Sequence, residues 1–286
     1  MEAKGSQYII HPSRADEFTI WNLSDLHYGN KGCAIDKLHE DILRIRSDPR
    51  AFWLGGGDYA EFIGLTDRRF DPDAVAEQLT VADMGRLGHV LMQRVKEMLW
   101  PIRHKCLGLL MGNHERQYMV SKDQLDLHGW LCTELEVPNL EYSALMDVVF
   151  VRRPTKAPML TRLAPRRGDN TSEVFRFFVA HGAGYAATPA GKLKRLIDFM
   201  TNIEADVYMV GHVHDQSGRR QVRIAANGGC TKLIQREAVG VISGSYLKTY
   251  AQGVTTYGEQ KGYAPTTLGA SFVRIRPDKR QVTGEI

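Results

Sequence analysis

The sequence predicts an α/β fold in which layers of β-sheet are flanked by α-helices. In the first half of the chain, short runs of β-forming residues alternate with segments of helical spacing. The carboxy-terminal third is mostly β-rich, and 43% of the 286 residues are hydrophobic, which supplies a large core. Because no internal repeat, low-complexity tract or long linker interrupts these patterns, we expect one domain over residues 1–286.

The expected elements of the first half follow from these two kinds of pattern. Apolar, β-rich runs predict strands at residues 18–24, 51–56 and 105–111. Helical spacing predicts a helix at residues 35–47 and another in the later part of the segment 58–100, where apolar residues recur every three or four positions. Pro101 then ends the second helix.

The second half continues with two helices and several strands. One helix carries Leu127, Trp130, Leu131 and Leu135 on one face, and another begins near Pro189. We expect the strands at residues 147–151, 174–180, 206–210, 222–226, 240–243 and 271–276.

Composition excludes several classes of protein. The four cysteines are far apart and form no C-x-x-C pair, which argues against a zinc ribbon or a disulfide framework and fits a reducing cytoplasm. Residues 1–17 lack the apolar stretch of a signal peptide, and no later run approaches the length of a membrane span. The net charge of +4 is too small by itself to indicate nucleic-acid binding. We therefore expect a cytoplasmic protein without a membrane partner.

Clusters of polar residues follow five of the expected strands. In chain order they contain Asp25 and His27, Asp58, Asn113 and His114, His181, and His212 and His214. The carboxyl ends of strands are where ligand sites form in open α/β sheets, because several loops meet there on a rigid support. Together these residues supply the mixed nitrogen and oxygen ligands that borderline divalent metals prefer.

In chain order the clusters read D-x-H, G-D, G-N-H-E, H and G-H-x-H, and the sequence from Asp25 to His214 resembles the calcineurin-like metallophosphoesterases. The resemblance implies an α/β fold with a layered, sandwich-like β-sheet core flanked by α-helices. It also implies a dinuclear metal site at the strand carboxyl ends and a hydrolase that acts on phosphate esters. After His214 only the β-rich character matches the family.

The resemblance implies two divalent metal ions per chain. The first ion would be bound by Asp25, His27, Asp58 and His214, and the second by Asp58, Asn113, His181 and His212. Asp58 would bridge the two ions, and a hydroxide that they share would be the nucleophile near neutral pH. We favour manganese, with iron, zinc, nickel or cobalt as alternatives, because this ligand set accepts several metals.

Two further residues have roles implied by the same resemblance. His114 would face the substrate and act as the general acid for the leaving oxygen, with Glu61 orienting it. In the phosphoprotein phosphatase branch an arginine clamps the phosphate at the position of Phe62, whose side chain cannot do so. This departure favours a phosphodiester substrate. Arg68, Arg69 or Arg116 could replace the missing clamp.

Three other functions stay open as alternatives. The first is a phosphomonoesterase, similar to a phosphoprotein phosphatase, with the same site. The second is a DNA or RNA nuclease, because residues 152–167 hold six basic side chains and no acid, and could contact a nucleic-acid backbone beside the metals. We expect this segment to be a solvated loop. The third, a non-catalytic scaffold, is least favoured because the ligand set is complete.

Two more segments bear on the site. Lys192, Lys194 and Arg195 follow His181 on the expected helix, and we interpret them as an exposed helix face. The segments 240–250 and 257–267 contain several glycines and tyrosines, and we expect them to help wall the substrate site.

Overall fold

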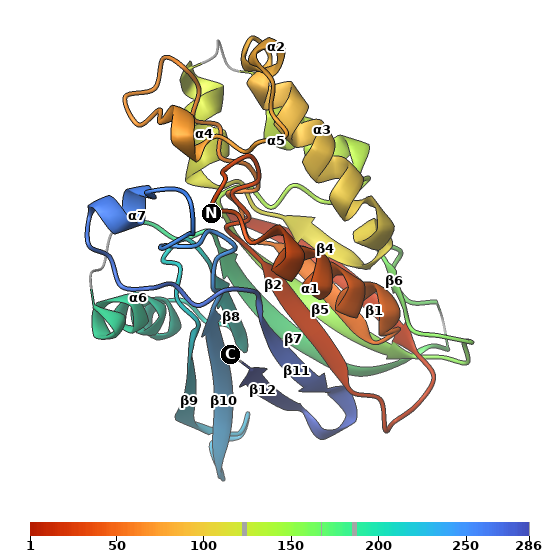
Figure 1. The fold of residues 1–286 in the computed structure, drawn as a ribbon. Coiled ribbons are helices and arrows are strands. Elements are labelled where there is room, and N and C mark those ends of the chain that lie inside the picture. The colour runs from red at the N-terminus through yellow and green to blue at the C-terminus, as the bar shows by residue number, and fades with distance from the viewer. Residues whose placement is uncertain (122–124, 167, 185–187, 286) are drawn as a thin grey trace.

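Two β-sheets pack face to face in the computed structural model, which describes residues 1–121, 125–166, 168–184 and 188–285 (Figure 1). The seven-stranded sheet has the order β6-β1-β5-β7-β8-β10-β9. Its strands are β1 (Glu2–His11), β5 (Ser143–Arg152), β6 (Met159–Thr161), β7 (Asn170–Ala180), β8 (Val207–Val210), β9 (Ser217–Ala226) and β10 (Leu233–Ile242).

The five-stranded sheet has the order β12-β11-β2-β3-β4. It is built from β2 (Phe18–Leu23), β3 (Ala51–Gly55), β4 (Cys106–Leu109), β11 (Ser271–Arg276) and β12 (Gln281–Glu285). Strands β2, β3 and β4 run parallel, whereas β11 is antiparallel to β2.

The main core lies between the two sheets. Side chains alternate along each strand, so that Phe18 and Ile20 of β2 face the other sheet while Trp21 faces outwards. From the seven-stranded sheet, Phe175 and Phe177 of β7 enter the same core. The alternation of apolar residues along the strands therefore produces both an inner and an outer packing surface.

Helices cover the outer face of each sheet. The buried sides of α1 (Ile35–Ser47), α3 (Leu87–Leu99) and α5 (Leu127–Glu134) pack on the five-stranded sheet, and α6 (Pro189–Asn202) packs on the seven-stranded one. This arrangement of helix, sheet, sheet and helix confirms the predicted fold class. The described helices include none that is long and apolar enough to cross a membrane.

Most expected elements are present with slightly different ends. Helix α1 has the predicted bounds, and α3 ends at Leu99, where a 3₁₀ helix that contains Pro101 begins. Strand β5 is longer than expected. Among the elements that the sequence patterns did not predict are strands β1, β6 and β12 and the helices α2 (Val81–Met84), α4 (Asn113–Ser121) and α7 (Tyr257–Gln260).

Candidate metal centre

The loops after five strands bring the seven expected ligands to one place. Strands β2, β3 and β4 of one sheet precede Asp25 with His27, Asp58 and Asn113, and strands β7 and β8 of the other precede His181 and His212 with His214. Because β7 and β8 are parallel, their carboxyl ends meet at the same edge. The centre therefore lies where the carboxyl ends of these strands from the two sheets come together, as expected from the position of the motifs.

The backbone at the centre is strained. Five of the seven candidate ligands have φ between 48° and 70°, namely Asp25, His27, Asp58, His212 and His214. This left-handed conformation costs a non-glycine residue on the order of 1–2 kcal/mol. Such strain clusters at functional sites, because the surrounding structure imposes it. Here part of that structure is a pair of backbone hydrogen bonds, from Asp25 N to Gly57 O (2.9 Å) and from His27 N to Asp58 O (3.1 Å).

The candidate ligand atoms lie close together, and Asp25, His27, Asp58 and His181 are buried. His214 Nε2 is 3.1 Å from Asp25 Oδ1 and 3.3 Å from His27 Nε2. On the other side of the centre, His181 Nε2 is 3.4 Å from Asp58 Oδ2. Asp25 and His181 are fully buried, and Asp58 is 2% exposed.

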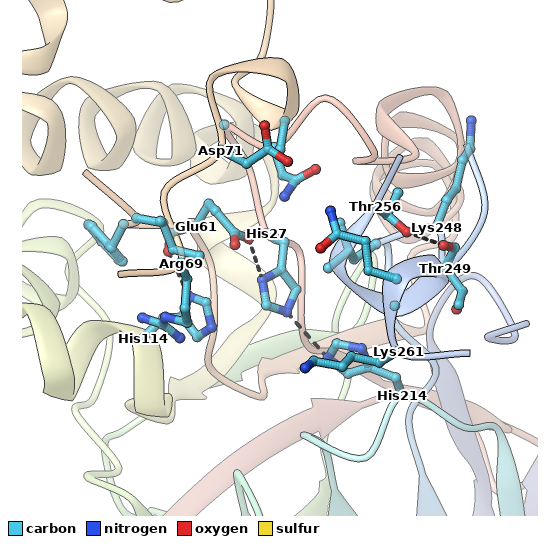
Figure 2. Close-up of a pocket in the computed structure, with 18 of the residues that line it drawn as sticks. His27, Glu61, Arg69, Asp71, His114, His214, Lys248, Thr249, Thr256 and Lys261 are labelled. Carbon is cyan, nitrogen blue, oxygen red and sulfur yellow. Dashed lines mark hydrogen bonds and ion pairs between the residues drawn. The ribbon is translucent and has the colours of Figure 1, made fainter. Parts of the chain in front are cut away.

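Hydrogen bonds fix which ring nitrogen of two histidines faces the centre. His27 Nδ1 lies 2.8 Å from Glu61 Oε2 (Figure 2). His181 Nδ1 lies 2.7 Å from the carbonyl oxygen of Gly56. Each Nδ1 therefore carries a proton to donate, and in the neutral ring Nε2 presents a lone pair. The Nε2 of His181 faces Asp58 Oδ2 and that of His27 faces His214 Nε2, so the centre collects nitrogen and oxygen atoms that can bind a cation. The donor set thus fits divalent metal ions.

The pKa values of the same groups are shifted in directions that favour positive charge on the histidines and negative charge on the carboxylates. Burial alone would lower the pKa of His27, but the Glu61 carboxylate raises it to about 9. Likewise, Asp58 overcomes the effect of burial on His181 and raises its pKa to about 10. For Asp25, burial acts to raise the pKa, yet the charge of His214 and its hydrogen bond bring it down to about 2. The carboxylates therefore stay ionised and draw positive charge to the centre.

The side-chain amide of Asn113 can turn either its oxygen or its nitrogen towards the centre. With its oxygen turned inwards, Oδ1 lies 3.0 Å from His181 Nε2 and adds one more acceptor. With the amide reversed, its nitrogen donates to His212 Nδ1 (2.8 Å) and Asp58 Oδ2 (3.1 Å). The first orientation is the one that a metal ligand needs.

The ligand-forming atoms fall into three overlapping groups, each with all its atoms within 4.8 Å of one another. The first contains Asp25, Asp58, His181 and His212, the second Asp25, His27 and His214, and the third His27, Glu61 and His114. The first two groups contain six of the seven expected ligands. In this arrangement Asp25 is the carboxylate shared by both of them, whereas the family resemblance implies Asp58 as the bridge.

Glu115, to which the sequence patterns assigned no separate role, holds two ligand loops together. Its buried carboxylate accepts hydrogen bonds from the backbone N–H groups of Asp58 (3.0 Å), Tyr59 (2.7 Å) and Gly112 (2.9 Å). A Cβ atom at Gly112 would lie 2.1 Å from the backbone nitrogen of Asp58, so only glycine fits there. Glu115 is the last residue of the G-N-H-E motif, and its place there is the sequence feature that could have indicated this contact between the loops.

Glu61 has a different contact from the one expected. Its carboxylate bonds to His27, while its backbone carbonyl oxygen accepts from His114 Nδ1 at 2.6 Å. Phe62, the next residue, has a φ of 53°, and the chain therefore turns so that the Glu61 carbonyl and side chain reach different histidines. The orienting group for His114 is thus backbone, and Glu61 positions a candidate metal ligand as well.

A cavity of about 1200 Å³ opens above the centre, and His27, His114, His212 and His214 all line it. The lining includes Leu247, Lys248 and Thr249 and several residues of 257–267, so the expectation that the segments 240–250 and 257–267 help wall the site is confirmed. The lining also includes Lys192, which corrects its interpretation as part of an exposed helix face.

Three arginines were candidates for binding the substrate phosphate. Arg68 and Arg69 line the cavity, whereas Arg116 is exposed and is not among the described lining residues. The guanidinium of Arg69 donates two hydrogen bonds to the Asp67 carboxylate, at 3.0 and 2.8 Å. Phe62 is 6% exposed and packs against Tyr118, with ring centroids 5.0 Å apart.

The basic segment 152–167 does not lie beside the metal centre. Strand β5 starts at the end of the sheet where the metal centre lies, because Ser143 pairs with Ala180 there. It ends at Arg152, opposite Asn170. Its ten residues span about 30 Å, and the segment therefore starts at the opposite end of the sheet. Arg152 and Arg153 also form ion pairs, with Asp278 and Asp169. Arg167 lies outside the described residues. The described part of this segment therefore gives no support to the nuclease alternative, in which it would contact a nucleic-acid backbone beside the metals.

No family model matches the sequence, and no curated protein matches it either. Thirty-seven chains of solved structures do match. One is an uncharacterised, predicted phosphoesterase from Streptococcus pneumoniae TIGR4, with 11% identity, a TM-score of 0.32, and 91% of this chain and 84% of that chain covered. Another is a single mutant of Vps29 from Entamoeba histolytica, with 11% identity, a TM-score of 0.34, and coverage of 94% and 97%.

A third match is the NAD nucleotidase of Haemophilus influenzae, with 8% identity and a TM-score of 0.39. The match covers 95% of this chain and 49% of that one, so this chain spans about half of the nucleotidase. The site itself is more specific than these overall likenesses. In the order of its motifs, and in their convergence on one buried centre between two sheets, this chain resembles the calcineurin-like metallophosphoesterases.

Proposed function

We propose that the chain is a metal-dependent phosphoesterase, formed as one domain by residues 1–286, that hydrolyses phosphodiesters. The observation that carries the proposal is the centre in which the carboxylates of Asp25 and Asp58 lie within 3.4 Å of the Nε2 atoms of His214 and His181, with His27 Nε2 beside them. Two divalent ions held by Asp25, His27, Asp58, Asn113, His181, His212 and His214 would supply charge neutralisation and an activated water.

The chain's own residues prepare this chemistry. Glu61 and Gly56 orient His27 and His181 through their Nδ1 protons, which keeps each Nε2 available for a metal. Ser24 and the backbone N–H of His212 both donate to Asp25 Oδ2, so that carboxylate cannot rotate freely. The ligands are therefore held in place by the protein before any metal binds.

His114 is the proposed general acid. Its Nδ1 is engaged by the Glu61 carbonyl, which leaves Nε2 as the atom that can carry a proton to the leaving oxygen. The imidazole lines the cavity and packs edge-on against His27, with ring centroids 4.9 Å apart. Proton donation from this position lowers the barrier most for a basic leaving group.

The charges near the cavity favour a diester over a monoester. A monoester dianion requires more neutralisation than a diester monoanion. Phe62, whose ring packs against Tyr118, carries no charge, and the nearby Arg69 is already paired with Asp67. These two positions therefore give no unpaired counter-charge for the dianion. Arg69 still supports the monoesterase alternative if its pairing with Asp67 can be exchanged for a phosphate.

The test compares bis-(4-nitrophenyl) phosphate with 4-nitrophenyl phosphate under equal pH and metal concentration. We expect a higher kcat/KM for the diester, with manganese the best activator when each divalent ion is returned in turn to the chelated protein. Phe62→Arg should shift the ratio towards the monoester. A wild-type preference for the monoester would overturn the diesterase assignment, and absence of turnover of both esters with every metal would overturn the phosphoesterase proposal.

A further inference from the structure

One wall of the cavity above the centre is largely apolar. It is formed by the chain between Ile63 and Leu91 and is here called the apolar wall. Five large hydrophobic side chains of this wall line the cavity and are only partly buried, namely Ile63, Phe70, Val75, Leu79 and Met84. Covering such surface with an apolar group is favourable, because it removes the surface from water. The proposed metals and the phosphate need polar contacts, so the chemistry of the centre leaves this wall without a role.

The apolar wall is an extension of the core on the five-stranded sheet. Leu87 and Leu91 of α3 line the cavity and also belong to that core, with exposed fractions of 5% and 1%. Leu79 and Met84 pack against the same core. Gly29, with a φ of 101°, brings its backbone close to Leu91, since a Cβ atom there would lie 2.6 Å from Cδ2 of that leucine. Buried side chains therefore hold the wall in place.

The middle of the apolar wall is joined to the loop that carries a candidate metal ligand. The loop that follows His27 pairs with residues 74–76 through two backbone hydrogen bonds, of 2.8 and 3.0 Å. Asn30 and Val75 are opposite each other in this short antiparallel pairing. Val75 therefore has a fixed position relative to the metal centre.

Two other parts of the wall are joined to the proposed general acid. Ile63 comes two residues after the carbonyl group that accepts from His114 Nδ1 at 2.6 Å. The Arg69 guanidinium donates to Gln117 Oε1 at 3.1 Å, and Gln117 lies one turn after His114 on α4. Phe70 is the next residue after that arginine. Figure 2 shows Arg69 and His114 on the same side of the pocket. The apolar wall therefore begins beside the group that protonates the leaving oxygen.

The charged residues of the apolar wall do not cover its hydrophobic part. The Arg69 guanidinium pairs with the Asp67 carboxylate at 2.8 Å. Asp71 caps a short 3₁₀ helix, because its carboxylate accepts from Asp73 N at 2.9 Å. Arg68, the third charged residue in the described lining of this wall, is exposed. The hydrophobic side chains are therefore the main surface that this wall presents to a substrate.

We infer that the apolar wall binds the leaving group of the substrate, so that the bond to be cleaved joins the phosphate to a hydrophobic group. This inference rests on the proposed phosphoesterase function and names the class of its substrate. The phosphate is bound at the metals, and the hydrophobic group lies against Ile63 and Phe70 with its oxygen beside His114. A hydroxide bonds to phosphorus, the bond to the leaving oxygen breaks, and that oxygen takes the proton of His114.

The first test compares two diesters that differ only in the size of the leaving group. They are methyl 4-tert-butylphenyl phosphate and methyl phenyl phosphate. Their phenolates have nearly equal basicity, so the need for a proton is the same and a difference reports hydrophobic contact. We expect the tert-butyl group to raise kcat/KM about 10- to 100-fold, as burial of several methyl groups does. Equal values for the two diesters would refute the subsite.

A second pair of diesters tests on which side of the phosphorus the apolar wall lies. In 4-tert-butylbenzyl phenyl phosphate and benzyl phenyl phosphate, phenolate leaves from both, and the tert-butyl group is on the side that stays with the phosphate. We expect these two diesters to have nearly equal kcat/KM. A gain as large as that of the first pair would contradict the assignment of the wall to the leaving group.

The variants show which residues cause the gain. The double substitution Ile63→Ala and Phe70→Ala should remove most of the gain in the first pair, mainly through KM. If the melting temperature shows that this protein is not folded, Phe70→Ala alone should remove part of the gain. Leu65→Ala is the matched control, because Leu65 is 65% exposed and is not among the described residues that line the cavity. It should retain the full gain. A full gain in the folded double variant, or in Phe70→Ala where only that protein folds, would refute the subsite.

A binding measurement separates this inference from the proposed function. Methyl 4-tert-butylbenzylphosphonate and methyl benzylphosphonate have a carbon in place of the leaving oxygen, so titration calorimetry with them needs no turnover. Tighter binding of the tert-butyl compound by the wild type, lost in the substituted protein, supports the subsite even if no ester is hydrolysed. Equal affinities of the wild type for the two phosphonates would contradict the subsite even if the diesterase activity is found.

Discussion

At the scale of single residues, Asp58 is the carboxylate that joins most parts of the centre. Its Oδ1 accepts from the backbone N–H of His114 at 2.8 Å, and its Oδ2 faces His181. We predict that Asp58→Ala abolishes metal binding and turnover, because the substitution removes the carboxylate that the family resemblance implies as the bridge and the group that holds His181. Metal content per chain and hydrolysis of bis-(4-nitrophenyl) phosphate measure the two effects.

The control for this substitution is Asp198→Ala, on the exposed surface of α6. It should keep the metal content and the rate of the wild type. Full occupancy together with full activity in Asp58→Ala would exclude the assigned centre.

His114→Ala separates acid catalysis from metal binding. We expect the variant to keep its metals and to lose about 10²- to 10⁴-fold in kcat, with a larger loss for diphenyl phosphate than for the nitrophenyl diester. The reason is that phenolate is the more basic leaving group and needs the proton more. His39→Ala, an exposed histidine on α1, is the control. Equal losses on both substrates would exclude the general-acid role.

The sequence motifs located the candidate ligands but not all of their contacts. Residue types and order were enough to predict which side chains meet, because each motif follows an apolar strand. They did not reveal that Glu61 contacts His27 through its carboxylate and His114 through its carbonyl. The two separate contacts of Glu61 depend on the left-handed conformation of Phe62, and phenylalanine is not a residue type that indicates such a turn.

At the scale of elements, Asp16 joins two connections of the fold. It lies between β1 and β2, where its buried carboxylate accepts from Ser13 N at 2.9 Å and from Arg50 Nε, just before β3, at 2.9 Å. Burial acts to raise the pKa of Asp16, but the hydrogen bonds from Arg50 and Ser13 hold it below its usual value. The ionised form is thus favoured in the folded state.

We predict that Asp16→Asn destabilises the protein at pH 7 by about 1–3 kcal/mol, as loss of a charged hydrogen-bond acceptor does. A lowered pKa contributes stability above the unfolded value of about 3.9, and this contribution is lost as the pH falls through the folded pKa. The difference in melting temperature between wild type and variant should therefore shrink below about pH 4. Asp36→Asn, on the exposed side of α1, is the control. A pH-independent difference would contradict the assignment to the carboxylate charge.

The sequence predicted single elements better than their directions. Apolar runs and helical spacing located α1, α3 and most strands, because those patterns are local. The direction of β5 is set by antiparallel pairing with β7, which the local pattern does not contain. As a result, the sequence could place the basic segment after a strand but not at the far end of the sheet. Phe70 and His114 likewise share a cavity only because the fold unites distant segments.

At the scale of the whole molecule, the centre connects the two sheets. Asp25, His27, Asp58 and Asn113 come from one sheet, and His181, His212 and His214 from the other. Metal bound by these residues would therefore stabilise the contact between the sheets. We predict that chelation lowers the melting temperature, since a ligand at 100 times its Kd stabilises the folded state by about 2.7 kcal/mol.

Thermal unfolding with and without excess chelator measures this effect. The Asp58→Ala protein provides the matched comparison, because a chain that binds no metal should show the same melting temperature in both conditions. If chelation left the wild-type melting temperature unaltered, metal could not be linking the sheets.

The strand order also has a consequence for the synthesis of this protein. Strand β2, which leads into Asp25, is flanked on one side by β3 and on the other by β11, and Trp21 stacks on Phe272 with ring centroids 4.5 Å apart. A ribosome adds about 5–20 residues per second, so β2 waits on the order of 10 s before β11 is made. Until then, one edge of β2 has no strand to pair with and Trp21 lacks its partner. We therefore predict that the candidate metal centre becomes complete only after translation has passed residue 276, and that the unpaired edge of β2 is open to aggregation during that interval.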